Sequence, residues 1–181
     1  TIKQGLLEHK CLRNLTLNFA RHWYISDEGL GYVGEAIRNL TDLECLSLDF
    51  SGDVDFYYNH LTDDGFVIIV ESTTALANTL KYLNLNFSCM GISDNALIIT
   101  SKYFQVLKKL VYFALNLSGS YNCPNRVISH VGLNSLKDGI KSLNHLETMI
   151  LKLTFCSNIR KSHLNDLKNG FKHVRNLMIK P

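Results

Sequence analysis

Apolar residues alternate with polar ones in five short stretches of the chain. The fullest form of the pattern is L-x-x-L-x-L-x-F, and the other copies differ from it by conservative replacements. A period of two residues is typical of a strand with one buried face, so each stretch predicts a strand. The five stretches are residues 12–19, 43–50, 80–87, 110–117 and 146–153.

A second pattern, with helical spacing, follows each of these strands. It begins with an apolar residue and a serine or threonine, after which apolar residues recur three or four positions apart. A serine or threonine at this point is typical of a helix N-cap, so each copy predicts a helix that buries one face. The N-cap residues are Ser26, Thr62, Ser93 and Ser129, and a fifth copy that opens at Ile159 has Arg160 in this position.

A sixth strand is expected at the end of the chain, in one of two registers. Counting from the preceding helix pattern places its start at Leu177. Val174, Leu177 and Ile179 match the strand pattern slightly better, which places the start at Val174. The sequence leaves both registers open.

The alternation of these two patterns resembles the leucine-rich repeat family. The match covers essentially the whole chain, and the long unit with a full helix is similar to the ribonuclease-inhibitor-like class. The asparagine-rich style, with phenylalanine closing most strands, looks like the divergent repeats of protists. One departure is plain, because family members usually place Asn or Cys directly after the strand. Here that position holds Ala20, Ser51, Ser88, Ser118 and Thr154.

The resemblance implies an α/β leucine-rich repeat solenoid, with a curved parallel sheet on the concave side and helices on the convex side. Each repeat of such a fold buries its apolar face only against its neighbours. We expect residues 1–181 to form a single domain of five to six repeats. We also expect it to be a segment of a longer array, because residues 1–11 and 177–181 resemble partial repeats. The strand register predicts one interior column of Leu15, Leu46, Leu83, Phe113 and Met149.

Composition favours a folded protein inside the cell. Of the 181 residues, 46% are hydrophobic and 19% are charged, which is typical of a chain with an apolar core. The best candidate for a membrane span, residues 66–70, is far shorter than the roughly 20 residues that a span needs, so no membrane insertion is expected. The five cysteines are odd in number and widely spaced, which favours reduced thiols. Three of the four N-x-[ST] sequons lie in predicted strands, which also favours an intracellular, cytoplasmic location.

The sequence contains no catalytic constellation. Gly-rich phosphate loops and G-x-S-x-G or H-E-x-x-H motifs are absent, and the seven histidines are scattered. Two pairs of acids, Asp27 with Glu28 and Asp63 with Asp64, lie in the first turns of predicted helices, where acids interact favourably with the helix dipole. We therefore predict a non-enzymatic protein with no cofactor, metal or small-molecule substrate.

The open face of the predicted sheet is one candidate surface for a partner. Strand alternation leaves three rows of side chains there, and most of them are small, neutral and polar. The candidates for contact are the neighbouring Tyr82 and Tyr112 and the strand-end amides Asn86 and Asn116. In the alternative, the asparagines hydrogen-bond only to one another and to water. The five strands place one cation, Lys152, on this face, which is too few for a nucleic-acid groove.

Two long loops form a second candidate surface. Every second strand-to-helix loop carries five or six extra residues, and these loops, at residues 51–60 and 118–127, should project from the same edge. Exposed aromatic side chains are typical of binding hot spots. In the alternative, these rings fold back over the edge of the sheet. The aromatic candidates are Trp23, Phe56, Tyr57, Tyr58 and Tyr121.

Charge divides the chain into two unlike halves. Residues 1–90 hold six basic and twelve acidic residues, whereas residues 91–181 hold thirteen and four, so the formal charges are −6 and +9. Four lysines lie at four-residue spacing on the predicted helices of the basic half. They form either a solvated helix face or a surface for an acidic protein segment or RNA. These lysines are Lys137, Lys141, Lys168 and Lys172.

The sequence favours a non-enzymatic protein–protein interaction module of a scaffold or assembly. One alternative is a regulatory repeat region of a larger multidomain enzyme, either a kinase or a GTPase regulator, since the Ran GTPase-activating proteins share this repeat class. A second alternative is a binder of an acidic partner or RNA through the basic half.

Overall fold

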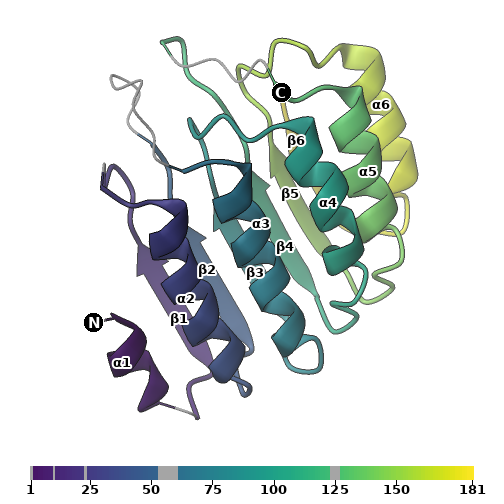
Figure 1. Cartoon of the computed structure of the whole chain (residues 1–181). Helices are drawn as coiled ribbons and strands as arrows, with labels where there is room; N and C mark the ends of the chain where they lie inside the picture. The colour runs from purple at the N-terminus through teal and green to yellow at the C-terminus, as the bar shows by residue number, and fades with distance from the viewer. Residues whose placement is uncertain (1, 10, 23, 53–60, 123–126) are drawn as a thin grey trace.

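Helices pack along one face of a parallel sheet in the computed structural model of the chain, and the described residues leave the other face of the sheet open (Figure 1). The structure describes residues 2–9, 11–22, 24–52, 61–122 and 127–181. Within them, six strands lie in sequence order, and all neighbouring strands are parallel. This is the predicted α/β leucine-rich repeat solenoid, with a curved sheet on the concave side and helices on the convex side.

Strands and helices alternate along the chain. The strands are β1 (Asn14–Asn18), β2 (Cys45–Asp49), β3 (Tyr82–Asn86), β4 (Tyr112–Asn116), β5 (Thr148–Lys152) and β6 (Asn176–Lys180). The α-helices are α1 (Ile2–Leu7), α2 (Asp27–Asn39), α3 (Asp63–Ser72), α4 (Asp94–Phe104), α5 (His130–Ile140) and α6 (Lys161–Gly170). A short 3₁₀ helix, η1 (Thr73–Leu76), extends α3.

The register of the sheet confirms the five predicted strands and the predicted interior column. Each pair of neighbouring strands aligns two column residues, from Leu15 opposite Leu46 to Phe113 opposite Met149. Leu177 of β6 continues the column, because it lies opposite Met149.

Of the two registers open for the sixth strand, the one that starts at Val174 is confirmed and the one that starts at Leu177 is wrong. The rejected register would place Lys180 in the interior column. A charge without a partner in an apolar core is costly, so the chain adopts the register that keeps Lys180 in solvent.

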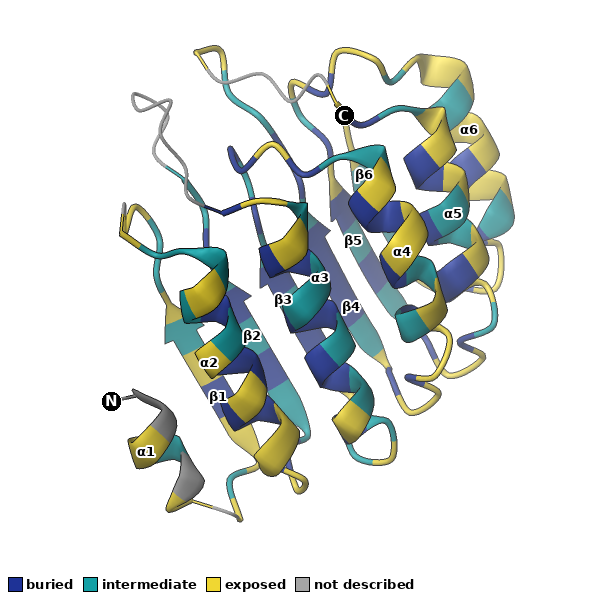
Figure 2. Ribbon diagram, viewed as in Figure 1, coloured by how far each residue is buried: buried dark blue, intermediate teal, exposed yellow. Residues whose placement is uncertain are grey.

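The interior consists of side-chain columns that run across the repeats, so that buried positions line the contact between sheet and helices (Figure 2). At the strand ends, the rings of Phe19 and Phe50 are stacked with centroids 5.5 Å apart, and the ring of Phe87 packs against Phe50 at a tilt of 44° with centroids 5.1 Å apart. A buried phenylalanine or leucine contributes roughly 1.5–3 kcal/mol. Because the columns cross from repeat to repeat, most of this stabilisation arises between neighbours and little of it within one repeat.

A ladder of hydrogen bonds links the helix N-termini of successive repeats. The predicted N-cap residues take this role in α2, α3, α4 and α5, and in each case the hydroxyl accepts from a backbone N–H of the first turn. The aspartate at the start of each of α2, α3 and α4 then accepts hydrogen bonds from the N-cap residue of the following repeat. These pairs are Asp27 with Thr62, Asp63 with Ser93, and Asp94 with Ser129.

The bonds of Asp94 show the geometry of this ladder. Its Oδ1 accepts from the backbone N–H groups of Ser129 at 2.8 Å and Gly132 at 3.1 Å, and its Oδ2 accepts from the Ser129 hydroxyl at 2.5 Å. A Cβ atom on Gly132 would lie 2.3 Å from Asp94 Oδ1, so a glycine there lets the carboxylate approach. Asp27, Asp63 and Asp94, the first acids of their helices, therefore join neighbouring repeats. The favourable interaction of these acids with the helix dipole does not by itself predict these bonds to the next repeat.

The ladder ends between α5 and α6. His130 takes the position at which α2, α3 and α4 begin with aspartate, and Arg160 replaces the serine or threonine N-cap. His163 Nδ1 accepts from the backbone N–H of Arg160 at 3.2 Å, and the rings of His130 and His163 are 4.9 Å apart. Repeat-to-repeat contact at this junction thus relies on packing without a carboxylate bridge.

Replacing Asp94 by alanine should lower the free energy of unfolding by about 2–3 kcal/mol, because three hydrogen bonds to a charged acceptor are lost. Urea denaturation followed by circular dichroism measures the change. Asp138→Ala is the matched control, since Asp138 is exposed on α5 and pairs only with Lys141 at 2.8 Å. It should change stability by less than about 0.5 kcal/mol. Equal losses in the two variants would contradict the ladder.

Candidate interaction surface on the open sheet face

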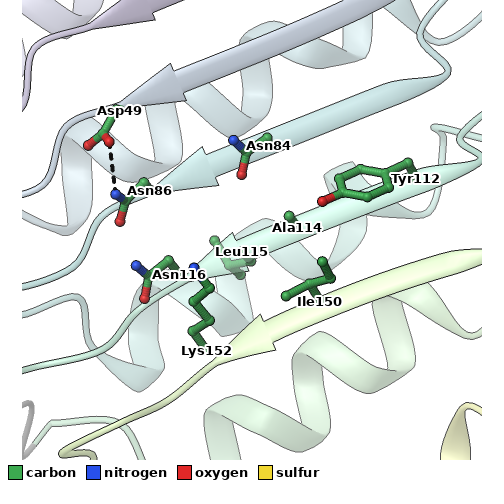
Figure 3. A pocket seen from close by; sticks show the side chains of 9 residues that line it. All are labelled: Asp49, Asn84, Asn86, Tyr112, Ala114, Leu115, Asn116, Ile150 and Lys152. Carbon is green, nitrogen blue, oxygen red and sulfur yellow. Dashed lines mark hydrogen bonds between the residues drawn. The ribbon is translucent and has the colours of Figure 1, made fainter. Parts of the chain in front are cut away.

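A hollow of about 230 Å³ lies on the open face of the sheet, over β2 to β5 (Figure 3). Most of its lining comes from strand positions that point away from the helices. Ala114, Leu115 and Ile150 are the aliphatic part of this lining, and polar side chains at the strand ends border it. The lining residues are Asp49, Asn84, Asn86, Tyr112, Ala114, Leu115, Asn116, Ile150 and Lys152. Three of the residues predicted for partner contact, Tyr112, Asn86 and Asn116, thus lie around one hollow.

Tyr82 and Tyr112 form a stacked pair beside this hollow. Their ring centroids are 4.1 Å apart and their planes differ by 7°. Burial, together with the neighbouring Tyr82 phenol, raises the pKa of Tyr112 to about 12. The Tyr112 hydroxyl therefore stays neutral at physiological pH, where it can donate or accept a hydrogen bond.

One atom of each strand-end amide, the side-chain oxygen, holds the turn that follows its strand. The Oδ1 atoms of Asn86 and Asn116 accept from the backbone N–H groups two residues further on, at 3.2 and 3.1 Å. Asp49 and Asn18 make the same bond in their repeats. Because a backbone N–H must face an oxygen, this bond also fixes which way each amide points. These oxygens therefore bond to the backbone of the following turn, a partner that the predicted alternative, with asparagines bonded only to one another and to water, does not include.

The amide nitrogens of the two asparagines differ. Asn86 Nδ2 donates to Asp49 Oδ2 at 3.0 Å, whereas Asn116 Nδ2 has no acceptor among the described residues. Lys152 lies opposite Asn116 in the register, and Figure 3 shows the two side chains next to each other. Lys152 also makes no ion pair with any described residue. Asn116 and Lys152 thus present hydrogen-bond donors to the open face.

Lys152 occupies a position that the first four strands fill with an Asx residue. The turn after β5 is completed differently, because the Ser118 hydroxyl of the previous repeat accepts from the backbone N–H of Thr154 at 3.2 Å. The fold therefore does not use the Lys152 side chain in its turn.

Lys180 is a residue of this face that the sequence reasoning missed. It lies opposite Lys152, so the described strands carry two neighbouring lysines here, where one was expected. The strand register decides this point, and the Val174 pattern, combined with the cost of burying a lysine, was the available signal.

The loop candidates are described only in part. Tyr121 is 86% exposed, so its ring does not fold back over the sheet. Tyr24, in the first loop, is 94% exposed. The two long strand-to-helix loops follow β2 and β4, as the extra residues in the sequence predict. The other four aromatic candidates, Trp23, Phe56, Tyr57 and Tyr58, lie outside the described residues.

The helix-face lysines divide into two groups. Lys137 donates to Asn134 Oδ1 at 3.0 Å, and Lys141 donates to Asp138 Oδ1 at 2.8 Å, so both have acceptors on their own helix. Lys168 and Lys172 are exposed, at the end of α6 and just after it.

The described residues contain no group of three histidine, cysteine or acidic side chains arranged to hold a metal. None of the described helices is long and apolar enough to cross a membrane. No disulfide joins the four described cysteines, Cys11, Cys45, Cys89 and Cys156. Burial raises the pKa of the Cys156 thiol to about 12, so this thiol stays protonated.

The strand-and-helix repeats and their open sheet define the class of structure, an α/β solenoid of the leucine-rich repeat type. Among solved structures, the chain is similar to the C-terminal domain of tropomodulin from Caenorhabditis elegans, which has a fold of this type. The two share 14% sequence identity with a TM-score of 0.57, over 96% of this chain and 93% of that chain. At this identity the similarity concerns the fold alone. No protein-family model and no curated protein match the sequence.

The raised pKa of Tyr112 predicts a pH dependence. The neutral phenol is favoured in the folded state, so its contribution to stability is complete below about pH 10, the ordinary tyrosine pKa, and is lost as the pH rises towards 12. Ultraviolet absorbance titration of the folded protein should show a component near pH 12 that disappears in Tyr112→Phe. Tyr82→Ala should move this component to lower pH, because it uncovers the Tyr112 ring. An unmoved component would contradict this origin of the shift.

Proposed function

We propose that this chain is a non-enzymatic protein–protein interaction module, part of a scaffold or assembly, and that it binds its partner on the open face of the sheet. The observation that carries this proposal is the hollow over β2 to β5, which is lined by side chains from four neighbouring strands and covered by none of the described helices. Protein-sized partners recognise such a surface through many spaced contacts.

The places where hydrogen-bond donors lack acceptors among the described residues support the open face as the binding surface. The helix side is occupied by core packing and by the aspartate ladder. On the open face, the Asn116 amide nitrogen and the Lys152 ammonium keep unused donors. Ile150 adds apolar surface beside the polar residues of the strand ends, a mixture typical of binding surfaces.

We propose further that the repeats belong to the long, ribonuclease-inhibitor-like class and form a single domain. Each of helices α2 to α6 has 10 to 13 residues, a full helix in each unit. One continuous sheet and one hydrophobic core run through the described repeats, which supports a single domain.

The loop edge is the second candidate surface. The exposed rings of Tyr24 and Tyr121 favour it, because aromatic side chains are enriched in binding hot spots. A partner that spans the sheet and this edge would contact both surfaces.

We also propose a cytoplasmic location. Four cysteines without disulfides fit a reducing compartment. A glycan on the Asn86 sequon would take its amide nitrogen, which donates to Asp49 Oδ2.

Partner binding by surface variants tests the proposed face. The partner is isolated from the source organism with the tagged chain, and its affinity is measured by isothermal titration calorimetry. Ala114→Lys places a long side chain in the hollow from a strand position that faces away from the helices, so it should weaken binding by about 2 kcal/mol or more while the circular dichroism spectrum shows that the chain remains folded. Two double variants are the controls: Tyr24→Ala with Tyr121→Ala for the loop edge, and Lys168→Gln with Lys172→Gln for the helix side.

Normal binding by Ala114→Lys together with loss of binding in the tyrosine variant would move the site to the loop edge. Loss only in the lysine variant, in a salt-dependent manner, would favour the helix face of the basic half. Unchanged binding in all three variants would contradict the proposal that these surfaces bind the partner.

A further inference from the structure

The strand-end row of the open face changes in charge from one side of the sheet to the other. The register aligns one residue from each strand, running from β2 to β6 through an acid, two amides and two lysines. These residues are Asp49, Asn86, Asn116, Lys152 and Lys180. The acidic end is internally satisfied, because Asp49 accepts from the backbone and hydroxyl of Ser51 and from the Asn86 amide.

The basic end has no such partners among the residues that the structure describes. Lys152 and Lys180 lie opposite each other on neighbouring strands, which are about 4.8 Å apart, and like charges in this arrangement repel. Neither lysine makes a hydrogen bond or ion pair with a described side chain. By contrast, Lys81, another cation next to the sheet, donates to Glu44 Oε2 at 2.7 Å.

An apolar strip runs beside these two lysines. Ile150 and Met178 lie opposite each other in the middle row, two residues before Lys152 and Lys180, and Ala114 continues the strip on β4. Met178 is exposed despite its apolar side chain. A ligand that matches this end of the face therefore carries anionic groups next to apolar ones.

We infer that the partner binds here through an acidic, extended peptide segment that lies across β4 to β6, with carboxylates on Lys152 and Lys180 and apolar side chains on Ile150 and Met178. This inference rests on the proposed function, because it names the chemistry of the same partner. Carboxylates two residues apart in an extended chain are about 7 Å apart, a separation that two flexible lysine side chains reach. The Asn116 amide nitrogen adds a neutral donor to the same anionic groups.

A protein segment fits this surface better than a nucleic acid does. Phosphate backbones need many cations, and the described strands place two lysines on this face. Base stacking needs aromatic faces, whereas Tyr82 and Tyr112 already cover one face of each other.

Fluorescence anisotropy with a labelled synthetic peptide tests the inference. The probe is a peptide of about nine residues in which glutamate alternates with leucine, a spacing that fits the extended-chain geometry. Lys152→Gln with Lys180→Gln should weaken its binding about tenfold or more, because two charge-assisted contacts are lost. The same loss should follow when glutamine replaces glutamate in the probe, and binding to the unchanged chain should weaken from about 50 mM to about 500 mM salt.

Lys168→Gln with Lys172→Gln is the matched control, since it removes the same charge from the helix side and should leave the affinity unchanged. A probe that does not bind the unchanged chain, or that loses affinity in this control as strongly as in the open-face variant, overturns the inference. Tighter binding of a uridine oligonucleotide, with the same dependence on Lys152 and Lys180, assigns the pair to nucleic acid and also overturns it.

The isolated partner separates this inference from the proposed function. If Ala114→Lys abolishes partner binding and the Lys152 and Lys180 variant does not, the open face is the binding surface and the acidic segment is wrong. If partner and probe both depend on the two lysines, the inference holds.

Discussion

Contact between successive repeats is the interaction on which the whole structure depends. One repeat consists of a five-residue strand and one helix, which is too little to enclose a core by itself. The interior columns and the stacked phenylalanines cross the boundaries between repeats, so each unit is ordered by its neighbours. The aspartate ladder fixes the alignment of neighbouring repeats, because each carboxylate bonds the N-cap residue of the helix in the next repeat.

The core is built on one face of the sheet, so the opposite face remains available for binding. Helices and apolar columns occupy the convex side, whereas the open face carries side chains that pack only against neighbours on the same face, such as the stacked Tyr82 and Tyr112. Asn86 and Asn116 bond the turns that follow their strands, and Asn84 bonds Ser47 on the neighbouring strand. The Lys152 side chain makes no such turn bond, because the Ser118 hydroxyl accepts from the backbone N–H of Thr154 in its place. Lys152 and Lys180, whose side chains make no hydrogen bond or ion pair with a described residue, are therefore the positions of this face most available to a partner.

Most of the fold is predictable from the sequence because its signals are local. The alternation of apolar residues fixes each strand and its buried side, and the serine or threonine N-caps mark where each helix begins. The aspartate ladder is not local: Asp94 and Ser129 are distant in sequence, and only the stacking of repeats brings them together. Likewise, the spare donor of Asn116 depends on which way its amide points, and a turn hydrogen bond decides this in the folded chain.

The residues of the candidate site could be predicted wherever the sequence determined the register of the strand. Tyr82, Tyr112, Asn86 and Asn116 follow from alternation alone, and the register places them together on the open face. Lys180 was missed because a shift of three residues in the last strand moves it between the interior and the surface. The cost of a buried lysine selects the correct register, so a packing criterion added to the pattern would have found it.

Site-specific photocrosslinking tests the central claim, that the open face of the sheet meets the partner, most directly. A benzoylphenylalanine residue is introduced at Ile150 on the open face and, separately, at the exposed Ile98 on the helix side, and each chain is irradiated with the isolated partner. The proposed interaction predicts a covalent adduct from position 150 and none from position 98. An adduct from position 98, with none from position 150, would contradict it.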